Sequence, residues 1–375
     1  MKHIVIVGGS FAGVSTAHRI LKQSAKTATG PFKITLVSRD SHFYWNIAAP
    51  RALLPEQIPD GKLFFPIAPG FDHYPAGKFE FVLGSATGLD VEAKQLEVDD
   101  CRRKTKLDYD FLILGTGSNT KGDTPFKSLG STESTEAALH EFQARVGNAK
   151  SIVVVGAGPT GVEVAGELGF QYGKSKQIIL ISNGPTVLEG RPASVSETAV
   201  KQLKALSVEL KLNTKVNSPV QLPDGSHELT LSSRDKLVVD MYIPTFGVQP
   251  NTSYVPSKFL DTNGFIEVNG YLGIEGAEGV FAIGDVSNAE PPQFWFVEKQ
   301  STHLAKNMVR VLRGKDPLPY KVEGLGMIGI QIGKKTGTGH IGNLKMPSFI
   351  ITMLRKSLFI EDLPRTVHGA SRWRN

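Results

Sequence analysis

Cysteine is almost absent from this sequence, because Cys101 is the one thiol among 375 residues. A single cysteine excludes an internal disulfide framework and any Cys-x-x-Cys redox pair. It therefore excludes reactions that need a dithiol, such as reduction of a disulfide substrate or dithiol-based oxidation of sulfide. A chain so poor in cysteine is typical of a reducing compartment.

Long hydrophobic runs are missing as well. No stretch of about 18 consecutive apolar residues occurs, so we expect no membrane-spanning helix. The first hydrophobic segment begins within three residues of Met1, so we expect neither a secretory signal nor a transit peptide. Hydrophobic residues make up 40% and charged residues 21% of the chain, as in ordinary globular proteins. We therefore expect a cytoplasmic protein of about two or three domains.

Acidic residues are scarce in the C-terminal part of the chain. Residues 310–375 hold 12 Lys and Arg against 4 Asp and Glu, a net charge of +8 in a chain whose total is +6. A basic region on a nearly neutral protein favours binding to an anionic surface, either lipid headgroups or nucleic acid. The alternative is a solvated basic face without a partner.

Two glycine-rich turns stand 148 residues apart, each between an apolar run and a helical pattern. The first is Gly8-Gly9-Ser10-Phe11-Ala12-Gly13, and the second is Gly156-Ala157-Gly158-Pro159-Thr160-Gly161. Such turns let the backbone N–H groups at a helix N-terminus face a pyrophosphate. Two of them in one chain predict two nucleotides held at once, the arrangement needed to pass a hydride between cofactors.

Each site departs from the usual dinucleotide pattern. Ser10 stands where the second glycine of the first turn belongs, although Gly9 is beside it. The acid that binds a ribose hydroxyl at the end of the second strand is replaced by Ser38 in one site and Ser182 in the other. Asp40 is close enough to substitute at the first site. Because the second site lacks this acid, the sequence excludes neither NADH nor NADPH as the hydride donor.

The order of the hydrophobic segments predicts one nucleotide-binding fold inserted into another. We expect an α/β protein with two Rossmann-like domains and a small C-terminal α+β region. The expected divisions are 1–122 with 248–312, then 123–247, then 313–375. Further expectations are an irregular segment at 42–75, a small antiparallel appendage from 79–83, 95–98 and 106–107, and one buried strand at 237–243.

The motifs together resemble a known family. The ordered set comprises residues 7–13, 42–51, 109–118, 154–167 and 282–285. It is similar to two-dinucleotide-domain flavoproteins of the apoptosis-inducing-factor-homologue and ferroptosis-suppressor branch, including its fungal members, beside type II NADH dehydrogenases. The resemblance implies FAD in the first site and NADH or NADPH as co-substrate in the second.

Site residues follow from this resemblance by position. For FAD it implies Gly8, Gly9, Ser10, Phe11, Ala12, Gly13, Ser38, Arg51, Ala86, Thr116, Gly117 and Asp285. Within this set, Arg51 would contact the diphosphate region, Ala86 the adenine, and Asp285 the ribityl chain or diphosphate. For NAD(P)H it implies Gly156, Gly158, Thr160, Gly161, Ser182 and Gly247.

Two residues are candidates for roles in the chemistry. A hydride would pass from nicotinamide C4 to flavin N5, with Glu163 near the nicotinamide. The segment 294–300 enters a helix that runs to about residue 312, and its N–H groups could face the reduced flavin, where Lys299 would add charge. The alternatives are an ion-paired helix residue for Glu163, a surface lysine for Lys299 and a helix N-cap for Asp285. The family's lysine near the C-terminus is replaced by Arg365.

A quinone is the simplest electron acceptor that remains, because it needs only an apolar slot over the flavin. Residues 294–296 are aromatic and would line this slot, or else pack in the core. The segment 346–360 reads as a basic amphipathic element that rests on a membrane surface, or else packs on the FAD domain. The rival functions are a flavin monooxygenase, a reductase of a protein partner such as ferredoxin, and a redox-sensing flavoprotein that binds nucleic acid.

Overall fold

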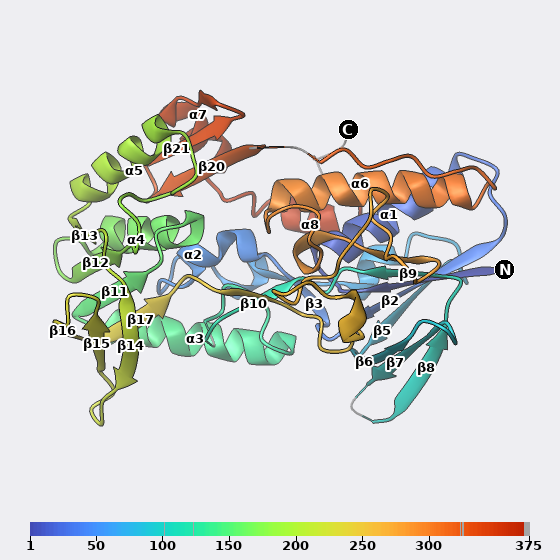
Figure 1. Ribbon diagram of the computed structural model, residues 1–375, viewed down its shortest axis with the longest axis horizontal. Coiled ribbons are helices and arrows are strands. Elements are labelled where there is room, and N and C mark those ends of the chain that lie inside the picture. The colour runs from blue at the N-terminus through green and yellow to red at the C-terminus, as the bar shows by residue number, and fades with distance from the viewer. Residues whose placement is uncertain (101, 123, 323, 325, 371–375) are drawn as a thin grey trace.

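The chain forms two α/β lobes that lie side by side in a computed structural model (Figure 1). The structure describes residues 1–100, 102–122, 124–322, 324 and 326–370. Cys101 therefore lies outside the described residues. Each lobe is built on a parallel sheet, which confirms the α/β prediction.

The sheet of the first lobe has the strand order β19-β9-β1-β2-β5, and all its neighbours are parallel. Alternate residues of β1 face opposite sides: Ile4 and Ile6 pack under α1, whereas Val5 and Val7 pack under the β6–β8 meander. Both faces are covered, which explains the continuous apolar runs in these strands. The elements are β1 (Lys2–Val7), β2 (Phe32–Ser38), β5 (Phe79–Leu83), β6 (Ser85–Asp90), β7 (Gln95–Asp99), β8 (Lys104–Asp108), β9 (Phe111–Leu114), β19 (Val280–Ala282), α1 (Phe11–Ala25) and α6 (Phe294–Val311).

The second lobe repeats this plan with the parallel order β13-β12-β11-β17. Helices α4 and α5 cover one face, and a three-stranded antiparallel meander covers the other. The elements are α3 (Thr132–Asn148), β11 (Ser151–Val155), α4 (Pro159–Tyr172), β12 (Gln177–Ile181), α5 (Ala193–Ala205), β13 (Val208–Lys211), β14 (Val216–Gln221), β15 (His227–Leu231), β16 (Lys236–Val239) and β17 (Met241–Pro244). The chain passes between the lobes through the antiparallel pair β10 (Ser118–Thr120) and β18 (Val248–Pro250).

Three sequence-based expectations are corrected. Residues 79–83 do not join the antiparallel appendage, because β5 extends the parallel sheet beside β2. The segment 237–243 is two strands rather than one, since the chain turns at Asp240, whose carboxylate accepts the N–H groups of Lys150 and Ser151. The segment 42–75 is partly regular. It contains β3 (His42–Tyr44), η1 (Asn46–Ala48), α2 (Ala49–Ala52), η2 (Asp60–Lys62), β4 (Phe64–Pro66) and η3 (Ala68–Phe71).

The C-terminal region contacts both lobes. A hairpin packs on α4, where Gly166 permits close approach: a Cβ there would stand 2.9 Å from the Cα of Ile332. Helix α8 packs near α1, where His18 Nε2 lies 2.7 Å from the carbonyl oxygen of Val367. Burial lowers the pKa of His18 to about 3, so this imidazole is neutral at pH 7. The elements are β20 (Met327–Ile332), β21 (Thr336–Ile341), β22 (Leu344–Lys345), α7 (Ser348–Arg355) and α8 (Asp362–Val367).

Helix length and hydropathy bear on membrane insertion. Among the helices of the described residues, none combines the length and apolar character that crossing a bilayer requires.

Candidate functional site

The two glycine turns are geometric copies of each other. Gly8 and Gly156 open them with φ angles of 117° and 107°, which side chains rarely adopt. A Cβ at Gly13 would stand 1.9 Å from the carbonyl oxygen of Gly8, and a Cβ at Gly161 would stand 1.8 Å from that of Gly156. Glycine is therefore required at these four positions by the turns themselves, whatever they bind.

The middle position of each turn has a different role. Gly158 is the N-cap of α4, and a Cβ built on it would meet no atom within 4 Å. Ser10 is the corresponding N-cap of α1, and neither residue makes a side-chain capping bond. The helix N-terminus behind each turn thus faces free space, as binding of a pyrophosphate requires. These residues fit a dinucleotide in both sites.

A cavity of about 470 Å³ begins at the first turn. This volume is in the range of small-molecule and cofactor sites. Most of the residues predicted for FAD line it, whereas Gly13 and Arg51 do not. The predicted residues in its wall are Gly8, Gly9, Ser10, Phe11, Ala12, Ser38, Ala86, Thr116, Gly117 and Asp285.

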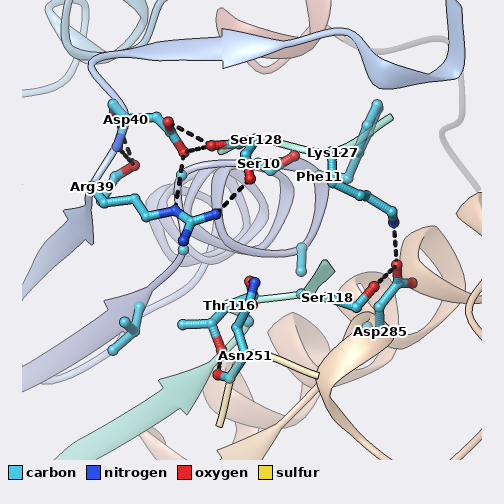
Figure 2. A pocket seen from close by; sticks show the side chains of 18 of the residues that line it. Ser10, Phe11, Arg39, Asp40, Thr116, Ser118, Lys127, Ser128, Asn251 and Asp285 are labelled. Carbon is cyan, nitrogen blue, oxygen red and sulfur yellow. Dashed lines mark hydrogen bonds and ion pairs between the residues drawn. The ribbon is translucent and has the colours of Figure 1, made fainter. Parts of the chain in front are cut away.

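One end of this cavity carries a carboxylate with two side-chain donors (Figure 2). Lys127 Nζ lies 2.6 Å from Asp285 Oδ2, and the hydroxyl of Ser118 donates to the same oxygen at 3.1 Å. Asp285 lies within the short helix η5 (Gly284–Val286), so it is not an N-cap. Sequence reasoning missed Lys127, because it belongs to no glycine motif and joins Asp285 only across 158 residues.

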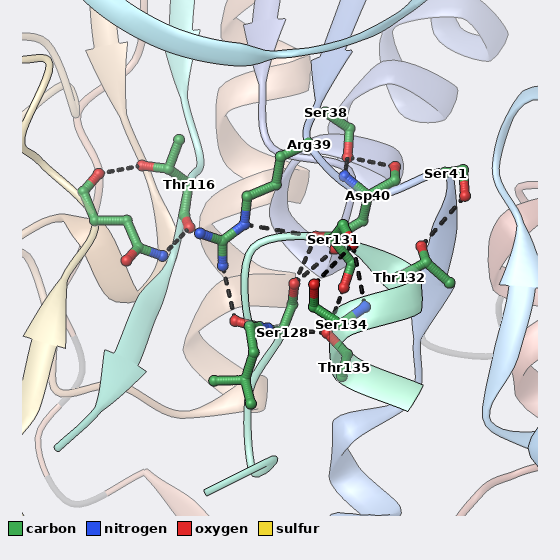
Figure 3. Close-up of polar contacts among 12 residues, drawn as sticks. Ser38, Arg39, Asp40, Ser41, Thr116, Ser128, Ser131, Thr132, Ser134 and Thr135 are labelled. Carbon is green, nitrogen blue, oxygen red and sulfur yellow. Dashed lines mark hydrogen bonds and ion pairs between the residues drawn. The ribbon is translucent and has the colours of Figure 1, made fainter. Parts of the chain in front are cut away.

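The other end holds the residues around the missing ribose acid (Figure 3). The hydroxyl of Ser38 donates to the carbonyl oxygen of Asp40 at 2.8 Å, which closes the loop after β2. The carboxylate of Asp40 accepts the hydroxyl of Ser128 at 2.7 Å and lies 3.8 Å from Arg39 Nε. Burial raises the pKa of Asp40, and Ser128 and Arg39 oppose this shift. Asp40 thus places a carboxylate in the wall where Ser38 supplies none.

A second cavity of about 420 Å³ adjoins the first. The two cavities share Asn46, Ile47, Lys127, Asp285 and Phe294, so they are direct neighbours with these side chains at their boundary. The second fingerprint and the chain after β17 contribute Pro159, Thr160, Glu163, Thr245 and Phe246 to its wall. The C-terminal region contributes Met327, Ile328, Gly329, Ile330, Met346, Ile351, Leu354, Arg355 and Phe359. The second fingerprint and the C-terminal region therefore meet at the second cavity, whereas the first fingerprint lines the first cavity.

Glu163 is both a wall residue and an ion-paired one. Arg355 Nη2, at the end of α7, lies 2.8 Å from Glu163 Oε1. Burial raises the pKa of Glu163, while the charge of Arg355 acts in the opposite direction. The ion-paired interpretation thus describes the Glu163 carboxylate, and the same residue also lines the second cavity.

The structure places Arg51 away from the cavity wall. Its Nη2 and Nε donate to Glu167 Oε1 at 2.7 and 3.0 Å, and Nη1 donates to the carbonyl oxygen of Lys356 at 3.1 Å. The guanidinium therefore joins α2, α4 and the residue that follows α7. This position differs from the expected contact with the FAD diphosphate.

Lys299 also lines neither cavity, a position that differs from the expected approach to the flavin. Its Nζ donates to the carbonyl oxygen of Lys321 at 2.7 Å and lies 3.7 Å from Glu290. Phe294 and Val297 are the residues of α6 that line the first cavity. Lys299 follows Val297 by two positions, about 200° around the helix, and so points to another face.

Ser182 and Gly247 lie outside the walls of these two cavities. The hydroxyl of Ser182 donates to the carbonyl oxygen of Thr186 at 3.1 Å and accepts the N–H of Gly184 at 3.2 Å. Gly247 has a φ of 75°, and a Cβ there would stand 2.7 Å from the side chain of Lys121. Their contacts with NAD(P)H stay predictions.

Comparison with known proteins identifies the family. Residues 2–310 match the family described as pyridine nucleotide-disulphide oxidoreductase. The oxidoreductase ptaL of Pestalotiopsis fici is 64% identical over 370 residues, 99% of this chain and 100% of that protein. Ferroptosis suppressor protein 1 of Homo sapiens is 25% identical over 374 residues, 97% of this chain and 95% of that protein.

A solved structure shares the fold along its whole length. NDH2 of Plasmodium falciparum, solved in complex with NADH, superposes with a TM-score of 0.78 at 15% identity and covers 100% of both chains. The family match, the two glycine turns and the two adjoining cavities agree. This chain therefore belongs to the pyridine nucleotide-disulphide oxidoreductase family and is a flavoprotein oxidoreductase that uses FAD with NAD(P)H.

Proposed function

We propose that this protein reduces a quinone-like acceptor with electrons from NADH or NADPH. The observation that supports the proposal is the second cavity, which adjoins the first fingerprint's cavity, the second fingerprint and the C-terminal region. Bound FAD would supply the hydride acceptor and a two-electron store. The single cysteine of the sequence argues against the dithiol chemistry to which the family name refers.

The residues of the first cavity would bind and orient FAD. The turn at 8–13 presents the N-terminus of α1 to the pyrophosphate. Asp285 would accept hydroxyl groups of the ribityl chain, and Lys127 and Ser118 hold its carboxylate in place. Asp40 would bind the adenosine ribose in place of the acid that Ser38 lacks.

Apolar side chains in the second cavity would exclude water and accept a quinone ring. Phe294 and Trp295 enter from α6, and Ile351, Leu354 and Phe359 enter from the C-terminal region. Such walls bind flat apolar ligands while few polar groups set their orientation.

Glu163 is the polar group that we place near the nicotinamide. Its pairing with Arg355 keeps an uncompensated negative charge out of this cavity. The same ion pair joins α4, on the side of the cavity where NAD(P)H would bind, to the end of α7, on the side where the quinone would bind.

We also propose a division of the chain by role. Residues 1–122 and 248–312 would bind FAD, residues 123–247 would bind NAD(P)H, and residues 313–375 would close the acceptor cavity. The strand orders of the two sheets and the C-terminal residues in the second cavity support this division.

A visible spectrum recorded under anaerobic conditions tests the function. We expect a flavin band that bleaches with NADH or NADPH and returns when a short-chain ubiquinone is added. A band that bleaches but does not return with quinone would favour the alternative of a protein acceptor such as ferredoxin. A protein that stays colourless with added FAD would contradict the proposal at its base.

The outward face of α7 supports a second proposal, contact with an anionic lipid surface. Phe349 and Met353 lie one helical turn apart, and their side chains are 70% and 68% exposed. Leu354, on the same helix, lines the second cavity. Lys345 and Lys356 precede and follow α7 in the chain and add positive charge near it, with Lys345 Nζ donating to the hydroxyl of Thr198. A lipid-soluble quinone could thus reach the cavity from the surface on which α7 rests.

Replacing Phe349 and Met353 by serine is expected to weaken binding to vesicles of mixed neutral and anionic lipids about tenfold or more, because two large apolar side chains leave the interface. Vesicle co-sedimentation measures this loss, and turnover with short-chain quinone should be unchanged. Val238→Ser removes an exposed apolar side chain elsewhere and is the control. Equal vesicle binding by all three proteins, or binding to duplex DNA instead, would contradict the lipid proposal.

A further inference from the structure

The second dinucleotide site lacks its ribose acid, and Ser182 does not replace it. Strand β12 ends at Ile181, where such folds place an acid that binds the ribose 2′-hydroxyl. The hydroxyl of Ser182 instead closes its own loop, through Thr186 and Gly184. The ribose of the hydride donor therefore needs another partner.

The carboxylate of Glu189, seven residues after Ser182, lies close to the end of this strand. A Cβ built on Gly184 would stand 2.4 Å from Glu189 Oε2, so the Glu189 carboxylate packs directly on Gly184. Gly184 follows Ser182 by two positions, and a side chain there would displace the carboxylate. Glu189 is exposed, so a ligand can reach it.

Backbone hydrogen bonds hold this loop against the glycine turn. The N–H of Leu188 donates to the carbonyl oxygen of Ala157 at 2.8 Å, and Ala157 lies between Gly156 and Gly158. The N–H of Asn213 holds the carbonyl oxygen of Gly184 at 2.9 Å from the other side. Glu189 thus directly follows Leu188, which is hydrogen-bonded to the second glycine turn. That turn would hold the pyrophosphate, and the adenosine ribose is the next group of the dinucleotide, so Glu189 follows a residue fixed close to it.

Two basic side chains of this neighbourhood have other contacts. Lys211 Nζ lies 2.9 Å from Glu209 Oε1. Burial lowers the pKa of His340 on β21, and the positive charge of Arg191 contributes to the same shift. The Glu189 carboxylate packs on Gly184, two residues after Ser182, and a negative charge at this place attracts hydroxyl donors and repels a phosphate.

We propose that Glu189 takes the role of the missing acid and makes this chain select NADH over NADPH. This inference rests on the proposed use of the second fingerprint for the hydride donor. Glu189 would accept the ribose hydroxyl groups of NADH, and its charge would oppose the 2′-phosphate of NADPH. It would set specificity without touching the reacting atoms.

Binding of two dead-end probes tests this proposal without turnover. Calorimetry of the FAD-loaded protein would compare ADP-ribose with 2′-phospho-ADP-ribose. We expect ADP-ribose to bind at least about tenfold more tightly, and Glu189→Gln to reduce this preference about tenfold, since the amide lacks the negative charge that strengthens the ribose hydrogen bonds and opposes the 2′-phosphate. Gly184→Ala should reduce the preference as well, because its Cβ displaces the carboxylate.

The matched control is Arg191→Gln, a charge change two residues away that should leave the ratio of the two Kd values unchanged. The ratio of flavin reduction rates with NADH and NADPH should follow the ratio of Kd values. Equal binding of the two probes by the unaltered protein, or an unchanged ratio in Glu189→Gln, would overturn the role of Glu189 alone. Failure of both probes to bind would overturn the donor site itself, whatever the quinone experiment shows.

Discussion

Replacing Gly158 by valine is expected to lower the rate of flavin reduction by NADH and NADPH about 100-fold or more while FAD stays bound. A Cβ at Gly158 meets no protein atom within 4 Å, and its φ of −71° suits any residue, so the chain itself tolerates the change. The added side chain fills the space in front of α4 where the pyrophosphate would lie. A displacement of about 1 Å can reduce the rate by this factor.

Stopped-flow absorbance of the flavin band measures this effect. Gly30→Val is a matched control, because a Cβ at Gly30 also meets nothing within 4 Å but lies far from the second turn in the chain, between α1 and β2. The control should keep the original rate, and both variants should keep their FAD content and melting temperature. Reduction of Gly158→Val at the original rate would show that the second turn does not hold the donor.

Replacing Arg51 by methionine is expected to lower the free energy of unfolding by about 3–5 kcal/mol. Glu167 is 3% exposed and accepts two hydrogen bonds from the Arg51 guanidinium. Without this partner, its carboxylate is a buried charge that must be neutralised or reach water. The guanidinium also donates to the carbonyl oxygen of Lys356, so the C-terminal region should detach more readily.

Denaturant unfolding followed by circular dichroism measures this loss. Changing both Arg51 and Glu167 to methionine should recover most of it, because an apolar pair replaces a buried ion pair. Lys236→Met breaks an exposed pair with Glu228 at 2.8 Å and should cost less than about 1 kcal/mol. If the double variant regains stability yet loses FAD, Arg51 contacts the cofactor as the family resemblance implied. An Arg51→Met protein as stable as the original would contradict the structural role.

Local patterns predicted the parts of the fold that depend on neighbouring residues. The turn at 8–13 needs only a buried strand and correctly spaced glycines, because Gly13 must clear the carbonyl oxygen of Gly8. The second turn obeys the same rule. The antiparallel strands β7 and β8 were also recognised from alternation. By contrast, the alternating segment 79–83 is expected in the antiparallel appendage but pairs with β2, because its own pattern does not specify which strand it will pair with.

The site residues show the same contrast between what local motifs predict and what the tertiary structure decides. The cavity-lining glycines and Asp285 follow from motifs, whereas Lys127 does not, and Lys299, which is expected near the flavin, lines neither cavity. A motif records which residue types a ligand needs. It does not record which cation will neutralise a given carboxylate.

The sequence by itself determined that this chain has two dinucleotide turns, lacks a dithiol and carries its excess positive charge near the C-terminus. Only the tertiary structure decided that Arg51 pairs with Glu167, 116 residues away, and that the C-terminal region closes the second cavity. The physical reason is that a buried charge or an apolar wall depends on partners brought together by the whole fold. Steric and hydrogen-bonding rules within a few residues cannot select such partners.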